Sequence, residues 1–332
     1  MNKVAVVILS WNARALLEQY LPSVVEHTPS DLADIILADN GSADASIDYA
    51  RSLGIEVLEL PENYGFARGY NEAIKLLEHE YVLLLNNDVR VTSGWLEPLL
   101  DFMENHPEAV SIQPKIRWDR QPDRYEYAGA EGGYLDWLGY PFCRGRIFNT
   151  LELSKGQYGS APKKVFWTSG AAMLVRRQCY VSEGGLDERF FAHQEEIDLC
   201  WRWNSAGYQL YVVPQSEVYH YGGASLSAEN PRKTFLNFRN NLLMLRKNLP
   251  DSKRNWVLSI RFFLDLLAAT AFLFQKKTKE AEAVIKAWSA FVKTPKSTRK
   301  GGRDRAYKEL YSHSILVRYH LFGEKTFDKL KL

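Results

Sequence analysis

The sequence has few cysteines and little net charge, and each shortage excludes classes of protein. Cys143, Cys179 and Cys200 are an odd number and form no Cys-x-x-Cys pair. A disulfide framework or a zinc site is therefore not expected, and a reducing cytosol fits best. A formal net charge of +2 over 332 residues is typical of neither a nucleic-acid-binding protein nor a disordered tail. We also find no internal repeat and no low-complexity segment.

The first residues lack the long apolar run of a signal peptide. The run Val4–Leu9 has only six residues, is rich in β-branched side chains, and is followed by Asn12 and Arg14. This pattern predicts a buried first strand.

What the sequence does contain is enough apolar material for a large core, with strand and helix patterns alternating over residues 1–110. Its residues are 46% hydrophobic and 13% aromatic. Such alternation predicts an α/β fold with a parallel sheet covered by helices on both faces. We expect strands at Val4–Leu9, Asp34–Ala38, Glu56–Leu60 and Tyr81–Leu85, and helices at Ala13–Glu26, Ala45–Ser52, Gly69–His79 and Trp95–Asn105.

The remainder of the chain is less regular. Residues 110–165 predict loops and short strands laid over one side of the sheet, without a core of their own. Within 166–225, a helix over Glu195–Ala206 is expected to end at Gly207, with a strand at Gln209–Val213 after it. Beyond residue 230 the pattern is helical to the end.

Polar residues follow the predicted parallel strands at the edge where such sheets bind ligands. They are Ser10 and Asn12, then Asp39, then Asn87 and Asp88. Each also has a structural interpretation, since Asp and Asn are common in turns and at helix starts. Their joint occurrence at one edge favours a site.

The acidic and imidazole groups among these candidates suit metal-assisted group transfer. Asp88 with a histidine such as His220 offers oxygen and nitrogen ligands for Mn²⁺ or Mg²⁺, although His220 could equally be a packed core residue. Glu195 or Glu196 could take a proton from an incoming hydroxyl, or could simply favour the start of a helix. A metal, a diphosphate and a base together predict transfer from a nucleotide-activated donor.

Seven segments in order carry a resemblance to a known family. They are "VVILSWN", "ILADNGSADAS", "NYGFARGYN", "LLLNNDV", "SGAAMLVRR", "GGLDERFFAHQEEIDLCWRWNSAGYQL" and "VYHYGGAS". Over residues 3 to about 250 the chain resembles the inverting family 2 glycosyltransferases, in the rhamnosyltransferase-like branch of bacterial surface polysaccharide synthesis. The resemblance implies the GT-A fold, which is Rossmann-like, and a nucleotide-sugar donor.

The resemblance also implies roles for individual residues. Asp39 matches the acidic residue that recognises the nucleoside of the donor. Glu196 matches the general base, with Glu195 as the alternative. The donor-binding residues are expected to be Ser10, Asn12, Asp39, Asn63, Gly65, Arg68, Asn71 and Asn87, the metal ligands Asp88, His220 and Asn86, and the acceptor-side residues Trp167, Gly170 and Asp198.

Two departures from the family pattern are visible. Asn86 stands where the family has the first acid of its Asp-x-Asp motif, so the ion is expected to be held weakly until the phosphates of the donor complete its shell. The base position carries Glu where Asp is commoner, which adds one methylene to the side chain.

The C-terminal region combines an apolar stretch with a basic one. Residues 255–274 are long enough to span a bilayer, but Arg261 and Asp265 interrupt them and can pair at a spacing of four. Residues 275–308 hold 11 Lys/Arg against three Asp/Glu, a local +8. We expect an interfacial helix on an anionic membrane, with Trp256, Ile260, Phe263, Leu267 and Phe274 on its apolar face. A helical hairpin packed on the catalytic domain is the alternative.

These observations predict a cytoplasmic, peripheral membrane glycosyltransferase that uses a divalent metal and a dTDP- or UDP-sugar, acts on a lipid-linked glycan, and binds no nucleic acid. A GT-A domain is expected over 1–250, with a nucleotide-binding half (1–110) and an acceptor-side half (111–250), and a helical, basic appendage over 251–332. A catalytically weakened sugar-nucleotide-binding scaffold, motivated by Asn86, is the first alternative. A nucleotidyltransferase is the second, although the segment after the first strand lacks a Gly-rich, basic triphosphate loop.

Overall fold

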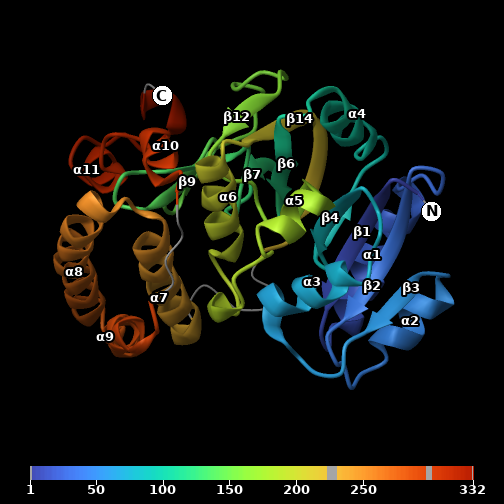
Figure 1. Cartoon of the computed structure of the whole chain (residues 1–332), viewed down its shortest axis with the longest axis horizontal. Coiled ribbons are helices and arrows are strands. Elements are labelled where there is room, and N and C mark those ends of the chain that lie inside the picture. The colour runs from blue at the N-terminus through green and yellow to red at the C-terminus, as the bar shows by residue number, and fades with distance from the viewer. Residues whose placement is uncertain (1, 223–229, 297–300, 331) are drawn as a thin grey trace.

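The protein is built around one large sheet (Figure 1). The computed structural model describes residues 2–222, 230–296, 301–330 and 332. The strands are β1 (Val4–Ser10), β2 (Ala33–Asp39), β3 (Glu56–Glu59), β4 (Tyr81–Asn86), β5 (Val89–Val91), β6 (Ala109–Trp118), β7 (Gln121–Tyr125), β8 (Gly133–Leu135), β9 (Pro141–Cys143), β10 (Arg146–Ile147), β11 (Thr150–Leu151), β12 (Lys163–Val165), β13 (Ala172–Arg176) and β14 (Gln209–His220).

Helices follow most of the strands and fill the C-terminal third. They are α1 (Arg14–His27), α2 (Ser46–Ser52), α3 (Gly65–Lys75), α4 (Glu97–Asn105), α5 (Arg177–Ser182), η1 (Glu188–Phe190), α6 (Glu195–Ala206), α7 (Pro231–Asn248), α8 (Asp251–Phe274), α9 (Thr278–Lys293), α10 (Arg303–Lys308), α11 (Ile315–His320) and η2 (Phe327–Leu330).

The main sheet is mostly parallel, as predicted. Its strand order is β12-β14-β6-β13-β4-β1-β2-β3. Strands β3, β2, β1 and β4 pair in parallel, as do β6 and β14, whereas β13 runs antiparallel between β4 and β6. Side chains alternate between the two faces of each strand, so consecutive residues of β1 enter different cores. One core contains α1, α2 and α4, and the other contains α3, α5 and α6. The predicted α/β fold with helices on both faces is confirmed.

The expectation for residues 110–165 was wrong in two respects. Strand β6 lies inside the main sheet, where it pairs with β13 and β14. Strands β8 to β11 form a second, four-stranded sheet with its own small core, to which Phe142 and Ile147 contribute together with Tyr311, Ile315 and Leu330. The core is assembled from segments more than 150 residues apart in sequence, and no local pattern reports such a pairing.

Two element boundaries also differ from the prediction. Strand β14 runs on to His220 instead of ending at Val213, with an irregularity in its pairing between Val213 and Glu217. Helix α3 begins four residues early, at Gly65, because the carbonyl of Phe191 accepts hydrogen bonds from its first free amides. Helix starts leave such amides unsatisfied unless another group accepts them.

Helices α7, α8 and α9 stand together at the end of the molecule farthest from β3 (Figure 1). Helix α7 shares a core with α6, and α8 and α9 pack on α7. Residues 302–330 fold back onto α6 and the second sheet, where the amide of Ile315 donates to Asp136 Oδ2 at 2.9 Å. The predicted boundary near residue 250 falls between α7 and α8 and stays a prediction.

Candidate active site

Three neighbouring parallel strands bring the predicted site residues to one edge of the sheet. In the register of the sheet, Ser10 at the end of β1 pairs with Asp39 at the end of β2. On the other side of β1, Leu9 pairs with Asn86 at the end of β4. The topology therefore places the three polar strand ends side by side, as the sequence predicts for a doubly wound sheet.

Asp39 is buried and only half satisfied. Its side chain is 1% exposed, and its Oδ2 accepts a hydrogen bond from the amide of Ser42 at 2.8 Å. Its Oδ1 has no hydrogen-bond partner in the part of the chain that the structure describes. A buried carboxylate oxygen without a partner is costly, so this atom is suited to accept a hydrogen bond from a ligand hydroxyl or imide.

The loop around Asp39 is fixed by side-chain contacts with the end of β1. Asn12 Oδ1 accepts from the amide of Ala43 at 2.8 Å, and the amide of Asn12 donates to Ser42 Oγ at 2.9 Å. Asn12 holds a positive φ of 45°, a conformation that Asn tolerates better than most residues. The carbonyl of Ser10 accepts from the amide of Asn40 at 2.8 Å, so Ser10 and Asn12 both hold the cradle beside Asp39.

The predicted donor-side loop is joined to the same cradle. Asn40 Oδ1 accepts from the amide of Tyr64 at 3.0 Å, and Asn63 Oδ1 accepts from that of Gly65 at 2.9 Å. The exposed guanidinium of Arg68 lies 3.8 Å from the centre of the Tyr64 ring, at the mouth of this loop. Arg68 is thus placed where an anionic ligand could meet it.

Asn71 is placed differently from the other predicted donor-binding residues. Its amide oxygen accepts from the hydroxyl of Tyr180 at 2.7 Å and from the amide of Leu186 at 2.9 Å. Its amide nitrogen donates to the carbonyl of Leu186 at 2.8 Å. Asn71 is buried and bonded to these partners. In the proposal below we therefore give it no contact with the nucleotide-sugar donor.

Asp88 lies beside His220, 132 residues away in sequence. Strand β5 pairs with the end of β14, so Val89 stands opposite His220. His220 Nε2 donates to Asp88 Oδ1 at 3.0 Å, and Asn86 Nδ2 lies 3.4 Å from the same ring nitrogen. The structure thus brings together the three residues that the sequence predicts as metal ligands.

A second carboxylate, that of Glu126, lies behind the imidazole ring. Its Oε1 is 3.4 Å from His220 Nδ1, and its Oε2 accepts from the amide of Ala128. Sequence reasoning missed Glu126, because residues 110–165 carry no pattern that places any one side chain. Only the pairing of β14 with β6 brings it to His220.

The charges of this cluster stabilise one another. Burial raises the pKa of Asp88, but the charge of His220 and its hydrogen bond outweigh burial and hold the pKa below its usual range. Burial lowers the pKa of His220, but the carboxylates of Asp88 and Glu126 together raise it well above its usual value. Asp88 is therefore ionised at neutral pH.

Asp88 and His220 fit a divalent ion as two of its ligands. Asp88 Oδ1 and His220 Nε2 share a hydrogen bond of 3.0 Å, and a divalent ion would take the place of the shared proton, since a metal-binding imidazole nitrogen must be deprotonated. A carboxylate on the far nitrogen, as Glu126 provides, is a common support of metal-bound histidine. Among the described residues no group of three or more His, Cys, Asp and Glu is arranged as a metal site, so water and ligand oxygens must complete the shell.

Glu195 and Glu196 begin α6 and differ in their surroundings. Glu195 is buried, and its Oε2 has no hydrogen-bond partner within the described segments. Burial, with the charge of Glu196, raises the pKa of Glu195 well above its usual value. Glu196 is partly exposed, and burial raises its pKa to about 7. Glu196 is therefore the member of the pair that both reaches solvent and exchanges a proton near neutral pH.

Gly170 connects Glu196 to the strand ends. A Cβ at Gly170 would lie 3.6 Å from that of Glu196, and the next residue, Ala171, accepts through its carbonyl from the amide of Asn86 at 2.9 Å. The proposed base and the metal-ligand turn thus flank one short segment.

The other two predicted acceptor-side residues are enclosed by protein. The indole nitrogen of Trp167 donates to the carbonyl of Tyr134 at 2.9 Å. Asp198 has no exposed surface and accepts from Arg202 at 3.0 Å and from Lys247 at 2.7 Å. We therefore carry neither residue into the proposal as an acceptor contact.

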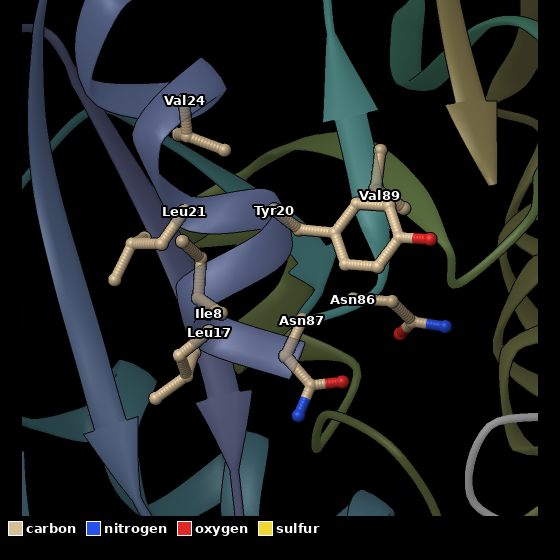
Figure 2. Close-up of a pocket in the computed structure, with 8 residues that line it drawn as sticks. All are labelled: Ile8, Leu17, Tyr20, Leu21, Val24, Asn86, Asn87 and Val89. Atoms are coloured by element: carbon tan, nitrogen blue, oxygen red, sulfur yellow. The ribbon is translucent and has the colours of Figure 1, made fainter. Parts of the chain in front are cut away.

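A small pocket behind the Asn86–Asn87 turn is not the ligand site (Figure 2). It has no room for a water molecule. Its walls are mostly aliphatic side chains of α1 and β1, from which the Asn86 and Asn87 amides point away in Figure 2. It is lined by Ile8, Leu17, Tyr20, Leu21, Val24, Asn86, Asn87 and Val89.

Comparisons with known proteins agree with this architecture. The family model for glycosyl transferase family 2 matches residues 5–179, more than half of the chain. The N-acetylglucosaminyl-diphospho-decaprenol L-rhamnosyltransferase of Mycobacterium tuberculosis is 30% identical over 236 residues, which cover 65% of this chain and 75% of that protein. Rhamnosyltransferase WbbL of Escherichia coli K12 is 28% identical over 48% of this chain and 61% of its own.

Solved structures show the same fold at low sequence identity. The Staphylococcus aureus TarS fragment 1–349 in complex with UDP-GlcNAc has a TM-score of 0.57 at 15% identity, over 97% of this chain and 88% of that one. The mannosyltransferase PcManGT of Pyrobaculum calidifontis, in complex with GDP-Man and Mn²⁺, has a TM-score of 0.53 at 13% identity, over 88% and 87%. The fold is that of the GT-A enzymes, and the chain is a glycosyltransferase that belongs to family 2.

Proposed function

We propose that this protein transfers a sugar from a nucleoside diphosphate to a hydroxyl group of a lipid-linked glycan, with inversion at the anomeric carbon. The observation that carries the proposal is the gathering of Asp39, the Asp88–His220 pair and Glu196 along one sheet edge. Asp39 supplies a hydrogen-bond acceptor for the nucleoside, the Asp88–His220 pair a site for the diphosphate, and Glu196 a general base.

The reaction is a single displacement. The acceptor oxygen forms a bond to the anomeric carbon while the bond from that carbon to the diphosphate oxygen breaks. Glu196 takes the proton of the acceptor hydroxyl, and the electron pair of the broken bond leaves with the diphosphate. Attack from the face opposite the leaving group inverts the anomeric centre.

The chain's own residues have distinct tasks in this reaction. The free Oδ1 of Asp39 accepts a hydrogen bond from the nucleoside, and Arg68 stands at the mouth of the donor loop. Asp88 and His220 would hold a divalent ion, Mn²⁺ or Mg²⁺, with Asn86 beside them. When bound, that ion neutralises charge on the departing diphosphate.

The names of the relatives guide the proposal for donor and acceptor. The mycobacterial relative is named for rhamnosyl transfer to N-acetylglucosaminyl-diphospho-decaprenol. We therefore propose a rhamnosyl-type donor, carried by dTDP or UDP, and a sugar on a polyprenyl diphosphate as the acceptor. The product would be a precursor of a bacterial surface polysaccharide.

A donor and acceptor screen tests the proposal. We expect dTDP- or UDP-sugars to raise the melting temperature more with Mn²⁺ than without it. When a GlcNAc-diphospho-polyprenol is added, the nucleotide sugar should release its nucleoside diphosphate and the lipid-linked acceptor should gain one sugar. NMR then compares the anomeric configuration of the new linkage with that of the donor. Donor binding with no transfer to any lipid-linked acceptor would instead favour the sugar-nucleotide-binding scaffold.

We also propose that α8 and α9 attach the enzyme to the inner face of the cell membrane. Helix α8 is long and apolar enough to cross a membrane, yet only 22% of its most apolar window is buried in the protein. Its polar pair faces inward, because Arg261 donates to the carbonyl of Leu138 at 2.9 Å and Asp265 accepts from the indole of Trp288 at 3.0 Å. The outward side is the apolar one.

The docking face is the exposed apolar surface of these two helices. It consists of Trp256, Phe262, Phe263, Leu266, Leu267, Leu273, Phe274, Ile285 and Val292. Large apolar side chains exposed on a helix pair fit a bilayer better than water. Of the apolar residues predicted for this face, only Ile260 is largely packed against the core.

Exposed lysines flank the docking face. Lys276 and Lys277 lie in the turn between α8 and α9, close in sequence to Phe274, which is 86% exposed, and Lys279 lies in the first turn of α9. Basic groups beside an apolar face favour a bilayer that carries anionic lipids, with ~1 kcal/mol from each charge near the surface. Lipid is therefore the partner whose chemistry matches both parts of the surface.

Charged substitutions on the docking face should release the full-length protein from vesicles. We expect the double variant Phe263→Glu, Leu267→Glu to lose most of its cosedimentation with vesicles of mixed anionic and zwitterionic lipid. Both side chains are 65% exposed, so the fold should persist. Leu76→Glu, at an equally exposed apolar residue of the catalytic domain, is the matched control and should bind like the wild type.

The lysines should act through charge. Replacing Lys276, Lys277 and Lys279 by Glu should weaken binding to anionic vesicles at low salt and change little with zwitterionic ones, since such attraction is screened over ~8 Å at physiological ionic strength. Equal pelleting of the wild type and the Phe263→Glu, Leu267→Glu variant would show that α8 is not a docking surface.

A further inference from the structure

The segment that leads into α6 is held in a strained conformation. Phe191 has φ 65° and ψ −57°, and the amide of Ala192 donates to the carbonyl of Phe190 at 2.8 Å, which closes a γ-turn of the rare positive-φ form. His193 and Gln194 follow with φ of 71° and 72°. Residues other than Gly avoid these regions, and each such residue costs on the order of 1–3 kcal/mol.

Strain of this kind persists only where surrounding groups hold it in place. The amide nitrogen of Asn240, in the middle of α7, has two hydrogens and lies within hydrogen-bond distance of three carbonyl groups of the strained segment. It lies 3.0 Å from the carbonyl oxygen of Phe190, 2.8 Å from that of Ala192 and 2.7 Å from that of His193. Asn240 is completely buried, so water cannot replace these bonds.

The neighbouring Arg239 strengthens the hold. Its guanidinium donates to the carbonyls of Arg189 and Phe190, both at 3.0 Å. The same guanidinium donates to Asn240 Oδ1 at 2.8 Å, which fixes the orientation of the amide. The two side chains thus present their donors to one short stretch of backbone.

The other side of the segment touches the donor loop. The carbonyl of Phe191 accepts from the amide of Phe66 at 2.9 Å, at the start of α3. The ring of Phe191 lies so close to Gly65 that a Cβ there would come within 2.6 Å of it. The strained segment is therefore held between α7 and the helix that carries the donor loop.

A second contact from α7 reaches the last residue before α6. Asn241 Nδ2 donates to Gln194 Oε1 at 2.9 Å and to the carbonyl of Gly139 at 2.7 Å. Arg261 of α8 donates in turn to Asn241 Oδ1. The position of α6 is thus set by side chains of α7 that α8 supports.

We infer that Asn240 is a positioning residue, which holds residues 190–194 so that α6 presents Glu196 to the acceptor hydroxyl. This inference rests on the proposed role of Glu196 as the base. Glu196 comes two residues after the strained segment, so a change in the backbone of that segment moves its carboxylate. A displacement of 1 Å at a reacting group can lower a rate ~10²-fold.

Removing the amide donors of Asn240 should lower turnover more than binding of the sugar donor. We expect Asn240→Ala to lower kcat by ~10- to 100-fold, with the donor KM within ~3-fold of the wild-type value. The donor loop keeps its contacts with Asn40 and Asn63 in this variant, since these two side chains accept from the amides of Tyr64 and Gly65. Asn237→Ala, three residues earlier on the same helix, is the matched control and should match the wild type.

An isosteric variant separates loss of the donors from loss of volume. Asn240→Asp keeps the oxygen that accepts from Arg239 but carries no amide hydrogen, and it sets a carboxylate against three carbonyls. It should lower kcat at least as much as Asn240→Ala. If one of the two fails to fold, the other still decides the question.

Hydrogen exchange gives a readout that does not depend on catalysis. The backbone amides of 191–196 should exchange at least ~10-fold faster in Asn240→Ala than in Asn237→Ala, while those of β1 and β4 stay unchanged. A folded Asn240→Ala protein with wild-type kcat and wild-type exchange at 191–196 would overturn the inference. Faster exchange with unchanged kcat would overturn the link to catalysis. Full activity of Glu196→Gln would instead count against the proposed base and leave the exchange result standing.

Discussion

Replacing Glu196 by Gln should lower sugar transfer by at least ~10²-fold and leave donor affinity unchanged, since a general base contributes on this scale. Gln keeps the size of the side chain but cannot accept the proton. Glu196 is partly exposed and begins α6, beside Gly170 at the sheet edge. Transfer is measured with a lipid-linked acceptor, and donor affinity by calorimetry with the nucleotide sugar and Mn²⁺.

The pH dependence of the wild-type rate should report the same group. Burial raises the pKa of Glu196 from its usual value to about 7. The base acts in its ionised form, so kcat should rise with pH and level off above about pH 7. In Glu196→Gln this acidic limb should disappear, because the group that titrates has been removed.

Glu195→Gln is the matched control. Burial and the charge of Glu196 raise the pKa of Glu195 well above its usual value, which favours the protonated form that Gln resembles. We therefore expect a smaller loss of transfer than in Glu196→Gln. The reverse ranking would move the role of base to Glu195, and near-normal rates in both variants would contradict the mechanism.

The parts of this enzyme that follow from local patterns could be predicted from the sequence. The first four strands are short apolar runs, and their parallel arrangement places Asp39 and Asn86 at one edge without any further information. The spacing of Arg261 and Asp265 likewise places them on one face of a helix, where the structure shows them paired at 3.3 Å.

The parts that depend on contacts between distant segments could not be predicted. Glu126 reaches His220 only because β6 and β14 pair across nearly a hundred residues. The early start of α3 depends on the carbonyl of Phe191, and the conformation of Phe191 depends on Asn240 of α7. A single sequence reports strand and helix periods, but it does not report which buried amide meets which strained loop.

The sequence also left open which face of α8 packs on the protein. Arg261 and Asp265 can pair with each other whether that side of α8 faces the protein or the solvent. The choice is made by partners on other elements, since Arg261 donates to the carbonyl of Leu138 and the indole of Trp288 donates to Asp265. Those partners turn the charged pair inward and leave Phe263 and Leu267 outside.

Replacing Asp88 by Asn should abolish the part of donor affinity that depends on a divalent ion. Asp88 is the only carboxylate in the Asn86–Asp88 turn, so no neighbour in that turn can take over its charge. Asn keeps the size of the side chain, and the backbone bond from the amide of Tyr221 to the carbonyl of residue 88 is unaffected. The fold should therefore persist, with His220 still beside the carboxylate of Glu126.

The measurement is the affinity for the nucleoside diphosphate with Mn²⁺ and with chelator. In the wild type, Mn²⁺ should strengthen binding, because an ion held by Asp88 and His220 would neutralise charge on the diphosphate. In Asp88→Asn, the two affinities should coincide at the weaker value, which Asp39 and the donor loop still provide. Asp119→Asn is the matched control. Asp119 is a carboxylate close to the same strand ends, but it already accepts hydrogen bonds from Arg90 and from the hydroxyl of Tyr20. It should keep the wild-type response to Mn²⁺. If Asp88→Asn also kept that response, Asp88 would not be the metal ligand, and the diphosphate would have to be neutralised by basic side chains such as Arg68.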